Sequence, residues 1–319
     1  MSQRLGQHFL KNKSVIKKII DAIDPRDNDV IIEVGPGHGE LTEHLEKQNV
    51  KCKIIAIERD ARLAASLEKK FLPFHRSTDS SLLRHPESAA GGEGFLHGLD
   101  SSSASGRIQN DRTEIWLARN DERGNKCPEI KVIHGDVLKV LPEVTYPPLT
   151  IHYKLVGNIP YYLTGHLFRV ISELPILPER TVFMIQKEVA ERITALPPRM
   201  NLLAASIRYW SEPNIITIVS KNDFSPPPKV ESAVLSLTTL PSAGREGDAA
   251  RKRYYRTIKL LFTQPRKTIL NNLKSGIASP REAILSELER TGIALHERPQ
   301  NLSVGDIKKI SEIVYNIIE

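Results

Sequence analysis

The chain has 319 residues, 40% of them hydrophobic and 26% charged, which is the balance of an ordinary globular protein long enough for two domains. No apolar run approaches the roughly 20 residues that span a bilayer, so the sequence excludes an integral membrane protein. The net charge of +7 and the pI near 9.3 favour a polyanionic partner, although many basic proteins bind nothing anionic.

The N-terminus and the cysteines bear on localisation and metal binding. The first residues lack the apolar segment of a signal peptide, and Cys52 and Cys127 form no cluster with metal-ligand spacing. We therefore expect a cytoplasmic protein without a metal site.

Strands and helices alternate along the first half of the chain. Apolar strands are predicted at 29–35, 53–58, 130–136, 153–158 and 181–186, and the first two are followed by helices at 41–48 and 62–72. This alternation predicts an α/β fold with a doubly wound, mostly parallel sheet, Rossmann-like and covered by helices on both faces. Two further strands, at 214–224 and 232–240, are close enough to pair as an antiparallel edge.

The pattern becomes helical after Pro241 and stays so to the end. We therefore predict two domains, an α/β domain at 1–241 and a smaller all-helical domain at 242–319. Residues 251–274 hold eight Lys/Arg and no Asp/Glu, and the basic residues alternate with apolar ones at helical spacing. One face of such a helix can pack while the other presents cations to phosphates, and a solvated surface is the alternative.

The segment 75–128 interrupts the α/β pattern. It is rich in serine and glycine and has little periodicity. Such a composition buries too little apolar surface to become ordered, so we expect a disordered insert in the first domain.

A glycine motif follows the first predicted strand. The stretch EVGPGHGELT (33–42) places Gly35, Gly37 and Gly39 between a strand and a helix, where the backbone can turn sharply and approach a ligand. The spacing differs from the dinucleotide motif G-x-G-x-x-G, and no Gly-Lys-Ser/Thr follows, which argues against a pyrophosphate cradle. A purely structural glycine turn remains the alternative.

Two acidic residues end neighbouring strands at the same edge. Glu58 closes the second strand, where a carboxylate can accept hydrogen bonds from both hydroxyls of a ribose. Asp136 follows the third strand, as an acceptor for an adenine amine or as the N-cap of the next helix. Together with the glycine turn they favour a nucleoside-containing cofactor.

The fourth strand delivers Asn158-Ile159-Pro160-Tyr161 to this edge. A neutral hydrogen-bonding amide, a restricted turn and an aromatic face are what a site needs to hold a flat base with an exocyclic amine.

In this order, the glycine turn, Glu58, Asp136 and the Asn-Ile-Pro-Tyr segment resemble the S-adenosylmethionine-dependent adenine N6-methyltransferases, and in particular the ribosomal RNA adenine N6,N6-dimethyltransferases. Further segments match GQHFL (6–10), QKEVAERI (186–193), FSPPPKVESAVLSL (224–237), FTQPRKTILNNL (262–273) and ERPQNLS (297–303). The resemblance covers the chain except the insert, and the third and fifth of these segments favour the small-subunit type.

The resemblance implies S-adenosylmethionine as the cofactor and roles for individual residues. His8 and Leu10 are expected to close over the cofactor, although a surface histidine and a core leucine are the alternatives. The expected cofactor-binding residues are His8, Leu10, Gly35, Gly37, Gly39, Glu58, Asp136, Val137 and Asn158. The expected catalytic residues are Asn158, Ile159, Pro160, Tyr161 and Phe224, with Phe224 either facing Tyr161 across the target base or anchoring the proline turn.

The implied activity is methyl transfer to the N6 amine of two adjacent adenines, each dimethylated, in small-subunit ribosomal RNA during ribosome assembly. The expected RNA contacts are Arg253, Arg256, Lys259, Arg266 and Lys267, and the protein is expected to act as a monomer. Two alternatives stay open, namely a large-subunit dimethyltransferase of the antibiotic-resistance type and a non-catalytic RNA-binding factor. Pro265 stands where the family usually has an arginine, so one RNA-facing cation is missing.

Overall fold

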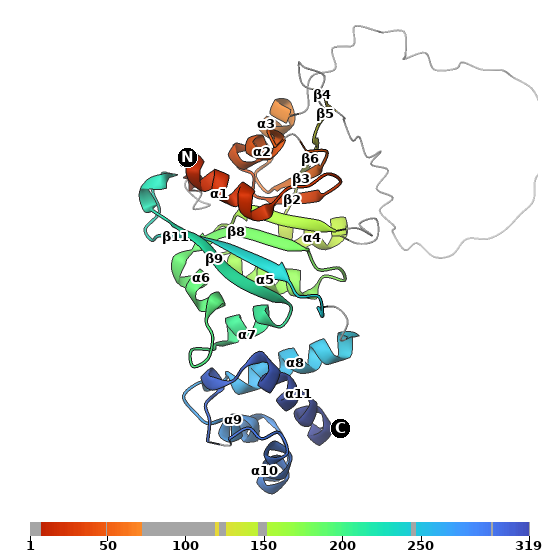
Figure 1. The fold of residues 1–319 in the computed structure, drawn as a ribbon, viewed down its shortest axis with the longest axis vertical. Coiled ribbons are helices and arrows are strands. Elements are labelled where there is room, and N and C mark those ends of the chain that lie inside the picture. Colours follow the sequence, from red (N-terminus) through yellow and green to blue (C-terminus); the bar gives the residue numbers. More distant parts are fainter. Residues whose placement is uncertain are drawn as a thin grey trace, which may run out of the picture.

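The molecule combines an α/β layer with a group of C-terminal helices. The computed structural model describes residues 8–48, 50–71, 119–120, 126–145, 152–243, 247–294 and 296–318. Figure 1 shows the sheet and its helices in the upper part and the C-terminal helices, in blue, below them. The predicted fold class, a mostly parallel sheet followed by a helical region, is confirmed.

The central sheet has seven strands in the order β6-β3-β2-β7-β8-β11-β9. Their bounds are β2 (Val30–Val34), β3 (Lys53–Glu58), β6 (Glu129–His134), β7 (Tyr153–Asn158), β8 (Arg180–Gln186), β9 (Ser211–Val219) and β11 (Ser232–Thr239). The first five in the sheet are parallel, and β11 runs antiparallel to both β8 and β9, as predicted. Strand β9 ends before its predicted limit because Ser220 and Asp223 form a capping box that starts the 3₁₀ turn η3 (Lys221–Asp223).

Helices cover both faces of the sheet. One face is covered by α1 (Lys13–Ile23), α2 (Glu40–Glu46) and α3 (Ala61–Phe71), the other by α4 (Val137–Thr145), α5 (Thr164–Glu173), α6 (Lys187–Thr194) and α7 (Leu202–Arg208). Successive residues of β2 alternate between the two cores, with Ile31 in the first and Ile32 in the second. A strand buried on both faces needs mostly apolar side chains, and in β2 the carboxyl of Glu33 is the one polar exception.

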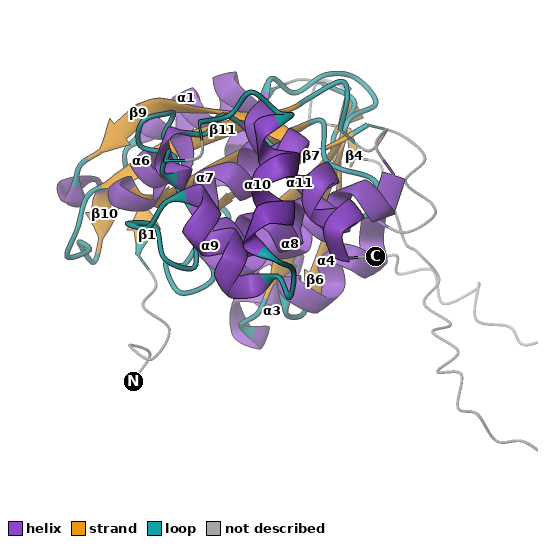
Figure 2. Ribbon diagram, turned by 90° about the horizontal axis from the view of Figure 1, so that it is seen from below, coloured by secondary structure: helices purple, strands orange, loops and turns teal. Residues whose placement is uncertain are grey.

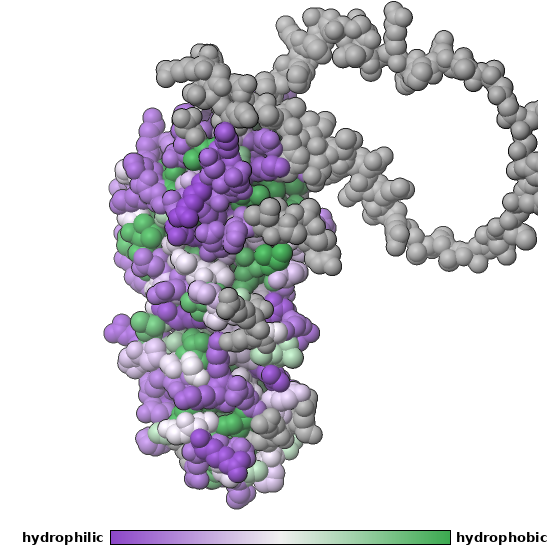
Figure 3. Space-filling view, turned by 45° about the vertical axis from the view of Figure 1, so that its right-hand side comes forward, coloured by the Kyte–Doolittle hydropathy of each residue, from purple (hydrophilic) through white to green (hydrophobic). Residues whose placement is uncertain are grey.

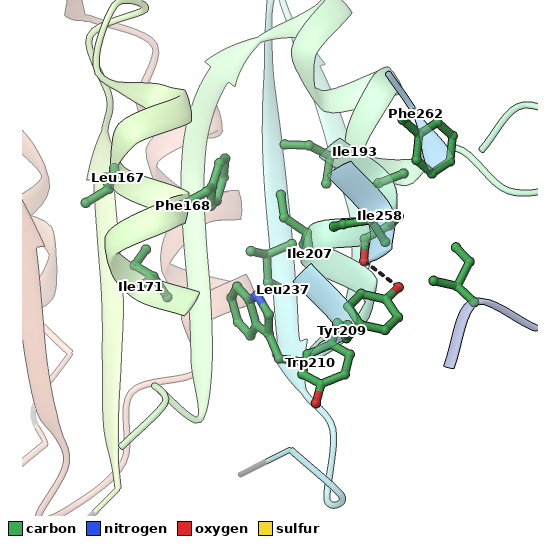
Figure 4. Packing of buried hydrophobic residues seen from close by; sticks show 14 of the residues in the cluster. Leu167, Phe168, Ile171, Ile193, Ile207, Tyr209, Trp210, Leu237, Ile258 and Phe262 are labelled. Carbon is green, nitrogen blue, oxygen red and sulfur yellow. Dashed lines mark hydrogen bonds between the residues drawn. The ribbon is translucent and has the colours of Figure 1, made fainter. Parts of the chain in front are cut away.

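The C-terminal helices are α8 (Gly247–Leu261), α9 (Ile269–Gly276), α10 (Arg281–Glu289) and α11 (Val304–Ile318). Their apolar residues join the core beneath the sheet, and Figure 4 shows this core running from Phe168 on α5 to Ile258 on α8. The Tyr209 and Tyr254 rings stack at 4.3 Å at the junction. The boundary predicted at residue 241 follows the end of β11, and the division into two domains stays a prediction because one core crosses it.

Most of the predicted insert at 75–128 lies outside the described residues. Its described part pairs β4 (Arg119–Asn120) with β5 (Lys126–Cys127), immediately before β6.

The surface is largely polar. On the face in Figure 3, hydrophilic side chains predominate and apolar ones form small scattered groups. Across the described ranges, every helix is too short or too polar to cross a membrane.

A buried ion pair ties the first helix to the sheet. Lys154 on β7 is 1% exposed, and its Nζ donates to Asp29 Oδ2 at 2.7 Å and to the Asp24 carbonyl, just beyond α1, at 2.6 Å. Burial makes a lone charge costly, so each partner depends on the other.

We expect Lys154→Met to lower the free energy of unfolding by about 3 to 5 kcal/mol, because it leaves the Asp29 carboxylate buried without its cation. Urea denaturation measures the change. Lys17→Met, which breaks an exposed pair with Asp21, is the control and should cost under about 1 kcal/mol. Equal losses in the two variants would contradict the prediction.

Candidate active site

A pocket opens at the carboxyl ends of β2, β3, β6 and β7. In an open α/β sheet the chain connections diverge at this edge, here between β2 and β7, and leave room for a ligand. The pocket is lined by His8, Phe9, Leu10, Ile16, Glu33, Val34, Gly35, Pro36, Gly37, Glu40, Leu41, Ile57, Glu58, Arg59, Gly135, Asp136, Val137, Asn158, Ile159, Pro160, Tyr161, Tyr162, Leu163 and Phe224. Every predicted cofactor and catalytic residue except Gly39 is among them.

Two glycines shape the floor of the pocket. Gly35 and Gly37 have φ angles of +66° and +61°, in the left-handed region that other residues rarely adopt. A Cβ on Gly37 would lie 2.8 Å from the Phe9 ring. The turn therefore requires glycine at both positions, and it exposes its backbone to the pocket.

Gly39 lies outside the pocket lining and packs between two helices. It is the N-cap of α2 with φ +83°, and a Cβ there would lie 2.7 Å from the Phe71 ring and 2.9 Å from Leu67. The missing side chain allows α2 to approach α3 closely. The sequence could not separate this packing glycine from the two that line the pocket.

Glu58 lies at the end of β3 with its carboxylate 4% exposed. Oε2 accepts from the Gly37 N–H at 3.1 Å, and Oε1 accepts from the Asp60 N–H at 2.9 Å. Each carboxylate oxygen has a second lone pair, so the group can still accept hydrogen bonds from a diol. The same bonds hold the glycine turn beside this carboxylate.

Asp136 caps a helix and also lines the pocket. Its Oδ1 accepts from the Leu138 N–H at 3.0 Å and so caps α4, while the residue also lines the pocket next to Val137. A capping carboxylate has a second oxygen that can accept from a ligand amine.

Asn158 ends β7 with its side-chain amide in a defined orientation. Nδ2 donates to the His8 carbonyl at 2.8 Å, which turns Oδ1 to the opposite side of the amide. Within the described part of the chain, no hydrogen bond reaches Oδ1. The amide therefore offers an acceptor at the pocket.

Aromatic side chains stand beside this acceptor. The Tyr161 hydroxyl hydrogen-bonds to Ser232 Oγ at 3.1 Å, which holds the ring near the end of β11. Phe224 begins β10 (Phe224–Ser225) and is 4% exposed, so it both lines the pocket and anchors the turn that follows. The Ile159 N–H donates to the Met184 carbonyl of β8 at 3.0 Å and fixes the start of the segment that follows β7.

Residues 8–10 line the pocket, and the last two of them pair with a second short strand. Strand β1 (Phe9–Leu10) pairs antiparallel with β10, as Figure 2 shows, and His8 Nδ1 lies 2.8 Å from the Pro226 carbonyl. Leu10 is 8% exposed and lines the pocket, so it belongs to the core, and its contact with the cofactor stays a prediction.

Glu33 is a pocket residue that the sequence analysis did not select. It is 1% exposed, and Oε2 accepts from the Thr42 hydroxyl at 2.6 Å. Burial raises the pKa of its carboxyl to about 7, although the Thr42 hydrogen bond opposes the shift. Its position directly before Val34 and the glycine turn was the available signal, but burial of a charge is not visible in a sequence.

The predicted RNA-binding residues lie on the C-terminal helices and away from the pocket lining. Arg256 and Lys259 on α8 are exposed, as are Arg266 and Lys267 in the turn before α9. Arg253 differs, because its guanidinium lies 4.4 Å from the centre of the Tyr315 ring.

The turn that carries Arg266 is stabilised by a backbone hydrogen bond and by a buried asparagine. The Lys267 N–H donates to the Gln264 carbonyl at 2.9 Å, which places Pro265 at the second position of a β-turn, where proline is favoured. The buried Asn272 side chain bonds the backbone of Gln264, Lys267 and Thr268. The proline that replaces a cation therefore fits the turn.

The fold and the pocket together define a Rossmann-like methyltransferase that uses S-adenosylmethionine. The seven-stranded sheet with one antiparallel strand, the glycine turn after β2 and the carboxylate ending β3 carry this assignment. The absence of a Cβ at Gly35 and Gly37 and the lone pairs left on Glu58 fit the cofactor.

A family model described as ribosomal RNA adenine dimethylase matches residues 1–79 and 117–316. The chain belongs to this family, and it is an S-adenosylmethionine-dependent ribosomal RNA adenine dimethyltransferase. The match skips 80–116, which is a shorter stretch than the insert predicted at 75–128.

Individual relatives of the chain have names that agree with this family. The chain is 32% identical over 306 residues to ribosomal RNA small subunit methyltransferase A of Dehalococcoides mccartyi, covering 96% of this chain and 86% of that protein. It is 27% identical to the protein of the same name from Mycoplasma mycoides, covering 97% and 96%. A dimethyladenosine transferase from Plasmodium falciparum shares the fold, with a TM-score of 0.66, 22% identity and coverage of 98% and 99%.

We expect Gly37→Ala to weaken S-adenosylmethionine binding at least about tenfold, because the new Cβ meets the Phe9 ring and the φ angle is unfavourable. Isothermal titration calorimetry measures the affinity. Gly165→Ala is the matched control, since a Cβ there meets nothing within 4 Å. Unchanged affinity in the Gly37 variant would show that the turn tolerates a side chain.

We expect Glu33→Gln to change the pH dependence of stability. The raised pKa means that the folded protein holds this proton more tightly than the unfolded chain, so the contribution to stability is full below pH 4.5 and is lost as pH rises to about 7. The unfolding free energy of the variant relative to the parent protein should therefore rise by about 2 to 3 kcal/mol between pH 5 and pH 8. Urea denaturation across this range measures it, and a constant difference would contradict the shifted pKa.

Proposed function

We propose that the protein dimethylates the N6 amines of two adjacent adenines in small-subunit ribosomal RNA, as a monomer acting in the cytoplasm on an assembling subunit. The observation that carries the proposal is the orientation of Asn158, whose Nδ2 is bonded to His8 so that Oδ1 faces a ligand donor. An acceptor of this kind beside Tyr161 suits an exocyclic amine on a flat base.

The cofactor would be held by residues from four strand ends. The backbone at Gly35 and Gly37 would lie against its methionine part, Glu58 would accept hydrogen bonds from the ribose hydroxyls, and Asp136 would accept from the adenine amine with Val137 beside it. When bound, S-adenosylmethionine supplies an electrophilic methyl group on a sulfonium.

The chemistry required of the protein is mainly positioning. The exocyclic nitrogen of adenine is a poor nucleophile because its lone pair is delocalised into the ring. Two acceptors, Asn158 Oδ1 and the Ile159 carbonyl, would bond its N–H groups and favour a tetrahedral nitrogen, while Pro160 restricts the turn that carries them. Tyr161 and Phe224 would hold the base between two rings, so that orientation replaces a strong base.

Double methylation follows from the same geometry. The first transfer leaves one N–H on the nitrogen, and this N–H can still donate to one of the two acceptors. The second transfer requires space for the first methyl group.

The target base must leave its stack to enter this pocket, which suits an adenine in a loop or a flipped adenine. The exposed cations Arg256, Lys259, Arg266 and Lys267 would bind phosphates of the surrounding RNA. Arg253 packs on Tyr315 and would contribute less than the other four.

Neither alternative is favoured. The relatives are named small-subunit methyltransferases, which weighs against the large-subunit enzyme. A non-catalytic RNA-binding factor would not need an acceptor amide, a glycine turn and a buried carboxylate together at one pocket.

We expect Asn158→Ala to reduce methyl transfer at least about 100-fold, because the amine loses its acceptor. Purified small subunits that lack the modification are incubated with protein and cofactor, and the RNA is analysed by mass spectrometry. Asn214→Ala on the exposed edge strand β9 is the control and should be as active as the parent protein. Near-normal turnover of the Asn158 variant would remove this residue from the mechanism.

We expect Arg266→Glu combined with Lys267→Glu to weaken RNA binding at least tenfold. The fall of log affinity with log salt should become less steep, by about 1.5 in slope, because two phosphate contacts are lost. Cofactor affinity should not change, because both residues lie outside the pocket. Lys47→Glu with Lys51→Glu makes the same change in net charge at exposed positions outside the pocket lining and serves as the control. An unaltered salt slope would identify the turn as a solvated surface.

A further inference from the structure

The N-terminal strap, defined here as residues 8–12, contacts both halves of the active site. On the cofactor side, the Phe9 ring lies 4.4 Å from the His38 ring and against Gly37. On the target side, β1 pairs with β10, so that Leu10 lies opposite Phe224. Between the two, the His8 carbonyl accepts the hydrogen bond from Asn158.

The strap is fastened at its far end by Asp223. The Asp223 carbonyl accepts from the Lys11 N–H at 2.8 Å, and Oδ1 accepts from Asn12 Nδ2 at 2.8 Å. Its second oxygen, Oδ2, accepts from the Ser220 N–H at 3.0 Å, which closes the η3 turn. One carboxylate thus joins the strap to the turn that leads into Phe224.

Asn12 is bonded on both sides of its side chain. While Nδ2 reaches Asp223, Oδ1 accepts from the Ser14 N–H at 2.9 Å and from the Ser14 hydroxyl at 2.8 Å, and so caps α1. The Asn12–Asp223 bond links two local caps that are 211 residues apart. Each cap retains its own hydrogen bonds when this bond is lost.

We propose that Asn12 and Asp223 are positioning residues that hold the strap so that the His8 carbonyl orients the Asn158 amide. In the described part of the chain, that carbonyl is the partner that fixes the Asn158 side chain. A strap displaced by about 1 Å would turn the acceptor away from the amine, and such a displacement costs about 100-fold in rate. The inference rests on the proposed role of Asn158.

The variants must separate this role from capping. Asn12→Ser keeps a good N-cap for α1 but is too short to reach Asp223. Asp223→Ala removes the other partner. Asp223→Asn keeps one oxygen that can still accept from Asn12 Nδ2, but it places an amide NH2 against the Ser220 N–H and so loses the η3 cap. This variant therefore tests the strap bond with the cap removed.

The experiment compares S-adenosylmethionine affinity by calorimetry, single-turnover methyl transfer to unmodified small subunits, and melting temperature. We expect Asn12→Ser to slow transfer about 10- to 100-fold and to weaken cofactor binding severalfold, with the KM for subunits and the melting temperature nearly unchanged. The double variant with Asp223→Ala should transfer no more slowly than Asp223→Ala alone, because both changes break one bond. Asp223→Asn should recover most of the rate.

Additive losses in the double variant, or an effect confined to melting temperature, would overturn the proposal and leave the two residues as local caps. A readout independent of methylation is the side-chain amide resonance of Asn158, assigned by its disappearance in Asn158→Ala. This resonance should shift and exchange faster with solvent in Asn12→Ser, and an unchanged resonance would refute the link. A parent protein that binds cofactor but methylates no RNA would count against the proposed function, while the resonance would still decide the positioning role.

Discussion

Parallel pairing of β2 with β3 on one side and β7 on the other is the constraint from which the site follows. Val34 at the end of β2 is in register with Ile57 and Gly157, so the residues that follow or end the three strands reach the same edge. Burial on both faces holds this register, because a shift by one residue would exchange the side chains of the two cores. The glycine turn, the Glu58 carboxylate and the Asn158 amide are therefore neighbours despite their wide separation in the chain.

Backbone groups organise the polar side chains at this edge. Glu58 accepts hydrogen bonds from the N–H groups of Gly37 and Asp60. Asn158 donates from its side-chain amide to the His8 carbonyl, and Asp136 caps α4. Each side chain keeps an oxygen for a ligand while its orientation is set by the fold. Such preorganisation suits a reaction in which positioning of the amine matters more than acid–base chemistry.

The two ends of the molecule divide the task. The sheet edge carries the pocket. The C-terminal region carries exposed cations on a turn whose backbone is bonded by the buried Asn272 side chain. Pro265 occupies a turn position that favours proline, which gives this turn a defined backbone. A continuous core from α5 to α8 connects the two ends, so the cationic turn is packed onto the same body as the pocket (Figure 4).

The sequence alone determined the main strands, their mostly parallel arrangement and the residues at their carboxyl ends, because apolar periodicity and glycine spacing are local properties that govern backbone geometry. The order of the strands within the sheet came from the tertiary structure. The sequence also determined the family, through motifs such as Asn158-Ile159-Pro160-Tyr161. Tertiary structure decided that Gly39 packs on α3 while Gly37 lines the pocket, that Glu33 is buried with a raised pKa, and that Asp223 bonds the strap. These properties depend on contacts between residues far apart in the chain and on exclusion of water, and neither is encoded in any local pattern.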